Sequence, residues 1–321
     1  MPRIVESMVG AKPFIKWVGG KSQLISQLEA LLPSDFRRWE DVTYIEPFVG
    51  GGAMLFYMLS TYPNIHRAVI NDINPDLTTC YRTVRDAPDA LLSALSEIQQ
   101  EYDSLGSEEA RSDFYYRMRD CFNAKNLDPV QNTTLFFFLN RTCFNGLYRV
   151  NSKGGFNVPF GKYESPSLYS AEVIYADSEL LQNVEILTGD FEQTFNRMKG
   201  NTLFYFDPPY RPLSNTSSFN NYSKEAFNDS AQVRLKRFCD RIHEAGGHFM
   251  LSNSDCKAKN ADDTFFDELY LNYNIERVWA SRSVNSNATK RGKLTELLVC
   301  NYENPYDVGE ASFISQMELS L

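Results

Sequence analysis

Residues 42–60 read VTYIEPFVGGGAMLFYMLS, and this stretch decides the fold. Val42–Glu46 is rich in β-branched and aromatic residues and predicts a buried strand, whereas the AMLFYMLS run that follows predicts a helix. Gly50, Gly51 and Gly52 lie between them, where missing side chains let a ligand approach the backbone at a helix start. This order is typical of the first unit of a doubly wound α/β sheet. Taken alone, the glycine run also fits a tight structural turn.

Other segments extend the same pattern along the chain. Six further runs predict strands: Arg67–Asn71, Val184–Thr188, Thr202–Phe206, His248–Ser252, Ile275–Ala280 and Thr295–Tyr302. Helical patterns lie between several of them, notably at 224–245. The last two strands have no room for a long helix between them, so we expect an antiparallel edge hairpin on a mainly parallel, doubly wound α/β sheet.

Residues 76–170 interrupt this alternation. Their first part is helical and charged, and the second, from Asn140 to Tyr163, is rich in Asn, Gly and aromatic residues. Within it, NSKGG at 151–155 predicts a β-hairpin tip. We interpret 76–170 as an inserted domain within a catalytic domain made of 12–75 and 171–302, with tails at 1–11 and 303–321.

Composition limits the class of protein. The 321 residues are 43% hydrophobic and 23% charged, a balance typical of soluble globular proteins. Six dispersed cysteines without a CxxC pair and only three histidines favour reduced thiols in a cytosol and no metal site. The N-terminal segment lacks the apolar core of a signal peptide, and the most apolar run, Leu135–Leu139, is too short to cross a bilayer. We therefore expect a cytoplasmic protein without a membrane partner.

The net charge of −9 argues at first against a nucleic-acid partner. Three windows differ from the rest of the chain: residues 12–28, 111–165 and 277–293 carry +3, +4 and +5. The remainder therefore carries −21. Scattered basic windows are often ordinary solvated charge, but windows that converge on one face would form a phosphate-binding cleft.

The tetrapeptide Asp207-Pro208-Pro209-Tyr210 follows the apolar run that ends at Phe206. Doubly wound sheets bind ligands beyond the carboxyl ends of their strands. The Asp207 carboxylate and a proline-stiffened carbonyl offer two acceptors, and Tyr210 offers a stacking face. This set suits a planar exocyclic amine, whose hydrogens would be held so that the nitrogen lone pair turns toward attack. A proline-rich turn with an aspartate cap is the alternative, and the buried strand before it favours the functional interpretation.

Two further motifs concern a nucleotide-like ligand. Asp72 ends its strand 22 residues after Gly50, where an acid binds ribose hydroxyls, so the pair indicates an adenosine-containing ligand. The segment WVGGKS at 17–22 ends like a P-loop, but that motif requires glycine where the chain has Ile15, and no strand precedes it. We therefore reject a nucleotide triphosphatase.

Taken together, the motifs resemble those of the Dam-type DNA adenine-N6 methyltransferases of the DpnII group. Their order is KWVGGK, EPFVGGG, NDIN, NRTCFNGLYRVN, FNVPFGKY, GDF, DPPY and RGKLTELLVCNY, over about 290 residues from Pro13 to Tyr302. Protein-glutamine methyltransferases share only the Asp/Asn-Pro-Pro-aromatic piece. The resemblance implies a Rossmann-like class I fold, S-adenosylmethionine as methyl donor, no metal, and the adenine of 5′-GATC-3′ in double-stranded DNA as acceptor.

The resemblance also assigns residues to roles. Those expected at the cofactor are Trp17, Lys21, Phe48, Gly50, Gly52, Asp72, Asp190 and Asp207. Those expected to hold the flipped adenine are Asp207, Pro208, Pro209 and Tyr210. Those expected at DNA are Lys16, Phe144, Asn145, Leu147, Arg149 and Pro159.

Within the DNA set, Phe144 would fill the gap left by the flipped base. Some family members have tyrosine there, and a wedge needs the ring rather than the hydroxyl. Arg149 suits the O6/N7 edge of guanine, whereas Leu147 and Pro159 suit a thymine methyl. Lys16 would contact a base at the other end of the site. The Ser/Asn-rich segment between Arg211 and Asp229 predicts a mobile loop over the site.

The leading hypothesis is direct methyl transfer to adenine, with Asp207 orienting and polarising the amine. A non-catalytic DNA-binding relative is the second hypothesis, and methylation of RNA or of a protein glutamine is the third. The intact DPPY, glycine turn and Lys21 argue against the second, and the CFNGLYR block argues against the third. A restriction endonuclease acting on the same site is a further expected partner.

Overall fold

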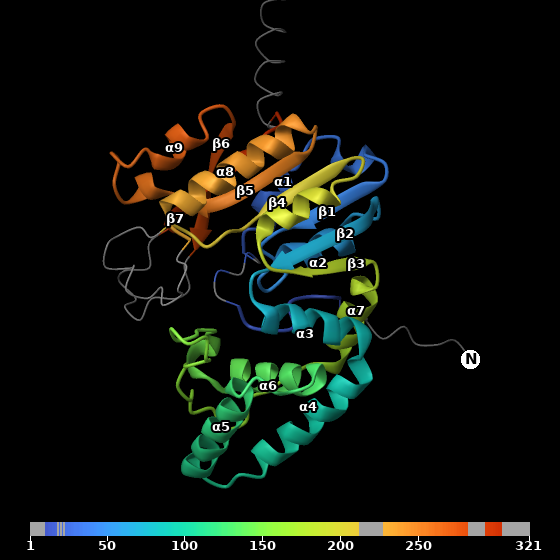
Figure 1. Ribbon diagram of the computed structural model, residues 1–321, viewed down its shortest axis with the longest axis vertical. Helices are drawn as coiled ribbons and strands as arrows, with labels where there is room; N and C mark the ends of the chain where they lie inside the picture. Colours follow the sequence, from blue (N-terminus) through green and yellow to red (C-terminus); the bar gives the residue numbers. More distant parts are fainter. Residues whose placement is uncertain are drawn as a thin grey trace, which may run out of the picture.

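The structure is a computed structural model that describes residues 10–17, 19, 21, 23–211, 227–281 and 293–303. Its central feature is a twisted sheet in the order β3-β2-β1-β4-β5-β7-β6 (Figure 1). The strands are β1 (Val42–Glu46), β2 (Ile65–Asp72), β3 (Val184–Thr188), β4 (Thr202–Phe206), β5 (His248–Ser254), β6 (Asn274–Ser281) and β7 (Lys293–Cys300). Neighbours among β1–β5 pair in parallel, whereas β7 is antiparallel to both β5 and β6. The expected mainly parallel sheet with an antiparallel edge hairpin is confirmed.

Helices cover both faces of the sheet. The helices of the sheet-containing part are α1 (Ile25–Ala30), α2 (Ala53–Thr61), α3 (Pro75–Asp86), α7 (Ala171–Leu181), α8 (Asp229–Glu244) and α9 (Phe265–Leu269). Successive β1 side chains point to opposite faces: Tyr44 joins the buried cluster of α2, α3 and α7, and Ile45 joins that of α8. This two-sided burial explains why β1 and β4 are apolar runs without alternation. The strand order and both helical layers make the fold Rossmann-like.

Three further helices form a separate layer, drawn below the sheet in Figure 1: α4 (Pro88–Asp103), α5 (Glu108–Asn123) and α6 (Pro129–Thr142). Their centre is α6, whose Phe136, Phe137 and Phe138 are buried against α3, α4 and α5. After α6, antiparallel bridges join Cys143 to Phe160 and Val150 to Phe156. The expected hairpin is therefore a loop closed by isolated antiparallel bridges. The boundaries of the expected inserted domain stay a prediction.

Some expected boundaries differ from the structure. The helix expected at 224–245 begins at Asp229 in the described residues, because the Asn228 side chain caps it by accepting from the Ala231 N–H at 3.0 Å. The strand expected at Thr295–Tyr302 ends at Cys300, because the Asn301 side chain turns to bond the Phe249 N–H and the Gly247 carbonyl. Residues 1–9, 212–226, 282–292 and 304–321 lie outside the described residues, and with them Arg282, most of the predicted loop and both predicted tails. Within the described part, no helix has the length and apolar character needed to span a membrane.

Candidate active site

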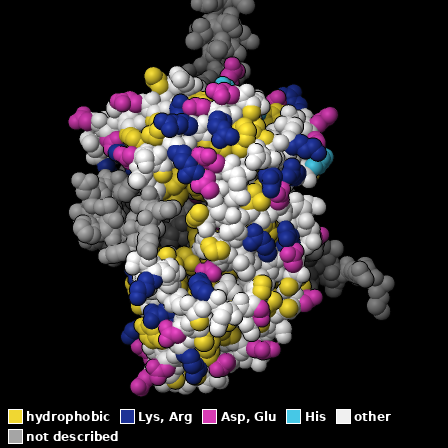
Figure 2. All heavy atoms as spheres, viewed as in Figure 1, with side chains coloured by type: hydrophobic (Ala, Val, Ile, Leu, Met, Phe, Trp, Pro, Cys, Tyr) yellow, Lys and Arg dark blue, Asp and Glu magenta, His cyan; other side chains and the backbone are white. Residues whose placement is uncertain are grey.

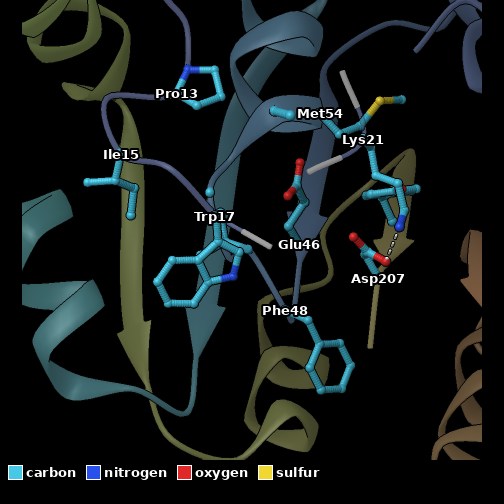
Figure 3. Close-up of a pocket in the computed structure, with 12 residues that line it drawn as sticks. Pro13, Ile15, Trp17, Lys21, Glu46, Phe48, Met54 and Asp207 are labelled. Carbon is cyan, nitrogen blue, oxygen red and sulfur yellow. Dashed lines mark ion pairs between the residues drawn. The ribbon is translucent and has the colours of Figure 1, made fainter. Parts of the chain in front are cut away.

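Strands β1, β2 and β4 end at the same edge of the sheet, and each carries an acid at or just after its end: Glu46, Asp72 and Asp207. Beside them lies a pocket of about 150 Å³, into which Trp17, Glu46 and Asp207 project (Figure 3). Trp17 and Lys21, from the segment before α1, also line this pocket. The motifs singled out in the sequence therefore meet at one place, at the carboxyl ends of parallel strands.

Asp207 is held by two neighbours from distant parts of the chain. The Lys21 Nζ lies 3.0 Å from its Oδ1, and the Ser252 hydroxyl donates to the same oxygen at 3.1 Å. Burial raises the pKa of Asp207, although the Lys21 cation and these hydrogen bonds act in the opposite direction. Because both described contacts use Oδ1, the Oδ2 atom can accept a hydrogen bond from a ligand amine.

Tyr210 is fixed at its hydroxyl and beside its ring. The hydroxyl donates to Glu296 Oε2 at 2.7 Å, and the Lys21 Nζ lies 4.4 Å from the ring centroid. Glu296 also lies 3.5 Å from the Lys21 Nζ. Lys21 therefore joins the acceptor Asp207 and the stacking ring of Tyr210 in one charged cluster.

The turn between Asp207 and Tyr210 is anchored from behind. The fully buried Gln232 on α8 donates to the Pro209 carbonyl at 3.2 Å and accepts from the Asn253 amide at 3.1 Å. Donors in the described residues thus engage the Pro209 carbonyl and leave that of Pro208 for a ligand.

The glycine turn forms a cradle beside Trp17. A Cβ at Gly50 would lie 2.9 Å from the Trp17 Nε1, and one at Gly51 would lie 2.8 Å from the Trp17 Cβ. The Gly50 N–H donates to Asp72 Oδ2 at 3.2 Å, and the Asn74 N–H donates to Oδ1 at 2.9 Å. Burial raises the pKa of Asp72 while these backbone donors oppose that rise. The turn thus requires glycine and orients an acid next to the pocket.

Glu46, quoted in the sequence motif without a role, proves to be a buried member of the site. Its side chain is 2% exposed and accepts a hydrogen bond from the Tyr44 hydroxyl at 2.7 Å. Burial raises the pKa of Glu46 to about 8, and the nearby charge of Asp207 adds to the rise against the opposing Tyr44 bond. Glu46 is therefore largely protonated at neutral pH.

Phe48 and Asp190 are the two remaining residues expected at the cofactor. Phe48 lines the pocket and packs against Phe191 and Phe227, with ring centroids 5.2 and 5.6 Å away. Asp190 accepts from the Glu192 N–H at 3.0 Å and forms an ion pair with Arg234. Asp190 is absent from the pocket lining, so its expected place beside an adenine ring stays a prediction.

The expected DNA residues gather around one turn after α6. Phe144 is 52% exposed, its N–H donates to the Pro159 carbonyl at 2.9 Å, and Asn145 and Gly146 have φ of +57° and +63°. Leu147 follows this turn, and the exposed Arg149 donates from Nε to Asn157 Oδ1 at 2.7 Å. Lys16 packs its side chain against Gly146.

Sequence reasoning missed Glu296, Ser252 and Asn140 as members of the site. Glu296 lay within a quoted motif, RGKLTELLVCNY, and the pairing of β7 with β5 brings it to Ser254. An acid in an otherwise apolar strand was the available signal. Asn140 likewise opened a quoted motif, NRTCFNGLYRVN, and Ser252 ended a predicted strand, but only the fold shows what their side chains contact.

Comparisons with known proteins agree with this geometry. The family model described as "D12 class N6 adenine-specific DNA methyltransferase" matches residues 17–284. "Type II methyltransferase M.MjaIII" of Methanocaldococcus jannaschii is 46% identical over 91% of this chain and 99% of its own length. "Type II methyltransferase M1.LlaDCHI" of Lactococcus lactis subsp. cremoris is 37% identical over 95% and 100%. The "DNA adenine methylase" of Escherichia coli strain K12 is 32% identical over 89% and 94%.

Proposed function

The chain belongs to the D12 class of N6 adenine-specific DNA methyltransferases, and from this premise we propose that it methylates a flipped adenine in 5′-GATC-3′ with S-adenosylmethionine as methyl donor. The observation that carries the proposal is the cluster in which Lys21 and Ser252 hold one oxygen of Asp207 while Tyr210 stands beside it. Family membership sets aside the non-catalytic, RNA and protein-glutamine alternatives.

The residues present fit S-adenosylmethionine. The glycine turn at 50–52 packs so closely on Trp17 and Tyr81 that side chains there would collide with them. Gly51 therefore borders the pocket with bare backbone, and Asp72 presents a carboxylate suited to ribose hydroxyls. The pocket between Trp17, Phe48 and Glu46 suits the methionine part. When bound, S-adenosylmethionine supplies an electrophilic methyl group.

The chain's own task is to present the target amine. Asp207 Oδ2 and the Pro208 carbonyl would accept its two hydrogens, and Tyr210 would stack on the base. With both hydrogens held, the nitrogen lone pair leaves conjugation with the ring and points at the methyl group. Attack by this nitrogen on the methyl group would release S-adenosylhomocysteine, and one proton of the methylated amine would pass to water. The Lys21 cation favours the ionised form of Asp207 and so opposes the rise in its pKa that burial causes.

The turn at Phe144–Gly146, called the recognition turn below, suits base flipping and sequence reading. An exposed Phe144 on a turn with two positive-φ residues suits a wedge that replaces the extruded base, at a cost of roughly a few kcal/mol. Arg149 is exposed, and its Nε and Nη2 donate to Asn157, which leaves the Nη1 hydrogens and the second Nη2 hydrogen for a guanine edge. Leu147 and Pro159 are placed for a thymine methyl, and Lys16 for the other end of the site.

The genomic role follows from the relatives' names. Two of them are called type II methyltransferases, which supports pairing of this enzyme with a restriction endonuclease that acts on the same site without contacting the chain. We propose that it works on double-stranded DNA in the cytoplasm.

Expression in a methylation-free host tests the proposal. Host DNA should become resistant to a nuclease that cuts only unmethylated GATC and sensitive to one that cuts only methylated GATC. Asp207→Ala should remove both effects, with a loss of rate on the order of 10²-fold or more, whereas Asp262→Ala at an exposed position serves as the control. Unprotected GATC sites would refute the target, and full activity of Asp207→Ala would refute the assigned role.

A further inference from the structure

One buried side-chain amide links the two halves of the site. Asn140, in the last turn of α6, is 2% exposed. Its Oδ1 accepts from the Lys16 N–H at 2.8 Å, and its Nδ2 donates to the Lys16 carbonyl at 2.8 Å. The same Nδ2 donates to the Gly146 carbonyl at 3.2 Å. Asn140 therefore holds the backbone before the pocket and the backbone of the recognition turn at once.

The two segments that Asn140 joins have different proposed tasks. Trp17, the neighbour of Lys16, forms a wall of the cofactor pocket and rests against the glycine turn. Gly146 follows the proposed wedge Phe144. A displacement of either segment therefore shifts the position of the other through one side chain.

Two further contacts reinforce this link. The Trp17 ring stacks on Tyr148 with centroids 5.5 Å apart and an interplanar angle of 26°. Lys16 packs on Gly146 so closely that a Cβ there would lie 2.6 Å from the Lys16 Cδ. Because Gly146 has φ of +63°, a side chain at this position is doubly unfavourable.

Only an amide satisfies all three backbone groups. A carboxylate of the same shape accepts from Lys16 but donates nothing, so two buried carbonyls lose their partner. An aliphatic side chain loses all three bonds. The identity of residue 140 thus controls the relative position of the two segments.

We propose that Asn140 is a positioning residue that makes the binding of DNA and of the methyl donor mutually dependent. The proposal rests on the function proposed above. When DNA binds the recognition turn, Asn140 and Tyr148 hold Trp17 against the glycine turn, so the cofactor binds more tightly. Such coupling is reciprocal: the cofactor strengthens the binding of DNA by the same factor.

Calorimetric titration of the full chain with S-adenosylhomocysteine, with and without a GATC duplex, measures this coupling. In the wild type, the duplex should tighten binding by roughly 5-fold or more. In Asn140→Asp, the ratio of the dissociation constants measured without and with the duplex should fall toward one. The control is Asn64→Asp: Asn64 donates to the carbonyls of Phe36 and Trp39 at 2.8 and 3.1 Å, at the opposite end of β1, so its loss should lower stability and leave the ratio unchanged.

Several outcomes would overturn the proposal. These are a wild-type ratio near one, an unchanged ratio in Asn140→Asp, or an equal fall in Asn64→Asp. If Asn140→Asp does not fold, Tyr148→Leu removes the second contact between the same segments and should lower the ratio instead. A wild type that binds and methylates no GATC duplex refutes the proposed function, whereas normal methylation with uncoupled binding refutes only the role of Asn140.

Discussion

Replacing Glu46 by glutamine separates the effect of its charge from that of its shape. Glutamine keeps an oxygen that can accept from the Tyr44 hydroxyl, which Glu46 now does at 2.7 Å. It removes the ionisable proton from a site that is 2% exposed. Any misfit of the new amide hydrogens is the same at every pH, so the pH-dependent part of the stability difference reports the carboxyl alone.

The magnitude follows from the pKa of Glu46. Burial raises it from 4.5 to about 8 in the folded protein, so the folded state keeps a proton that the unfolded state has lost. The stabilisation that this proton gives the folded state is complete below pH 4.5, and it is lost as pH rises through the folded pKa of about 8. The wild type should lose about 1.4 kcal/mol per pH unit relative to Glu46→Gln between these limits, with a total on the order of 5 kcal/mol.

Urea unfolding of both proteins between pH 5 and 9 measures this difference. Burial also raises the pKa of the fully buried Asp177 to about 8. Asp177 contributes the same pH dependence to the stability of both proteins, so its contribution cancels in the difference. Glu185→Gln is a control with the opposite sign. Burial raises the pKa of Glu185, but bonds from Arg197 and Arg67 outweigh burial and lower it. The stability difference between Glu185→Gln and the wild type should therefore change with pH only in acid. A stability difference between Glu46→Gln and wild type that stays flat from pH 5 to 8 would refute the reasoning.

Three more predictions concern the site. Gly52→Ala places a Cβ against the Tyr81 hydroxyl at φ of +73°, so we expect a loss of roughly 1–3 kcal/mol in urea unfolding and weaker binding of S-adenosylhomocysteine; unchanged binding would contradict this. Gln232→Leu removes the donor that holds the Pro209 carbonyl; single-turnover methylation should slow about 10-fold while DNA affinity is retained, and an unchanged rate would remove the positioning role. Burial raises the pKa of Asp207 above its ordinary 3.8 and the amine needs its ionised form, so the single-turnover rate should fall in acid before pH reaches 3.8; a rate that stays constant down to that pH would contradict it.

Local sequence predicted the sheet well because its strands are distinct. Val42–Glu46, Val184–Thr188 and Thr202–Phe206 are short β-branched or aromatic runs bounded by turn residues, and the structure reproduces their bounds. The helix boundary at Asp229 was missed because Asn228 acts as a cap, and a single Asn among polar residues carries little signal.

The site was predictable only where one motif carries the chemistry. Asp207 and Tyr210 lie three residues apart in one motif, so their closeness was visible in the sequence. Glu296 reaches Tyr210 and Lys21 only through pairing of the last strand with β5, a contact that no local pattern encodes. The role of Asn140 was equally hidden, since its partners lie 124 and 6 residues away.

Charge along the sequence also misjudges the DNA-facing field. Lys125 pairs with Asp76 at 2.6 Å and Lys162 with Glu108 at 2.7 Å, and both acids lie outside the basic window at 111–165. On the face in Figure 2, Lys and Arg side chains lie among Asp and Glu rather than in one basic field. Much of the +4 counted for this window is therefore neutralised in the fold.

Several cations remain for DNA. Lys16, which packs on Gly146, and Arg149, which donates to Asn157, form no ion pair with another described residue. The same holds for Arg111, Arg119, Arg141 and Lys153 of the window at 111–165. Arg282, in the window at 277–293, lies outside the described residues. Each neutralised phosphate contributes about −0.9 to the slope of log K against log salt concentration. Neutral substitution of a cation that meets a phosphate should therefore make this slope shallower by about 0.9, whereas substitution of one that lies away from the DNA should leave it unchanged.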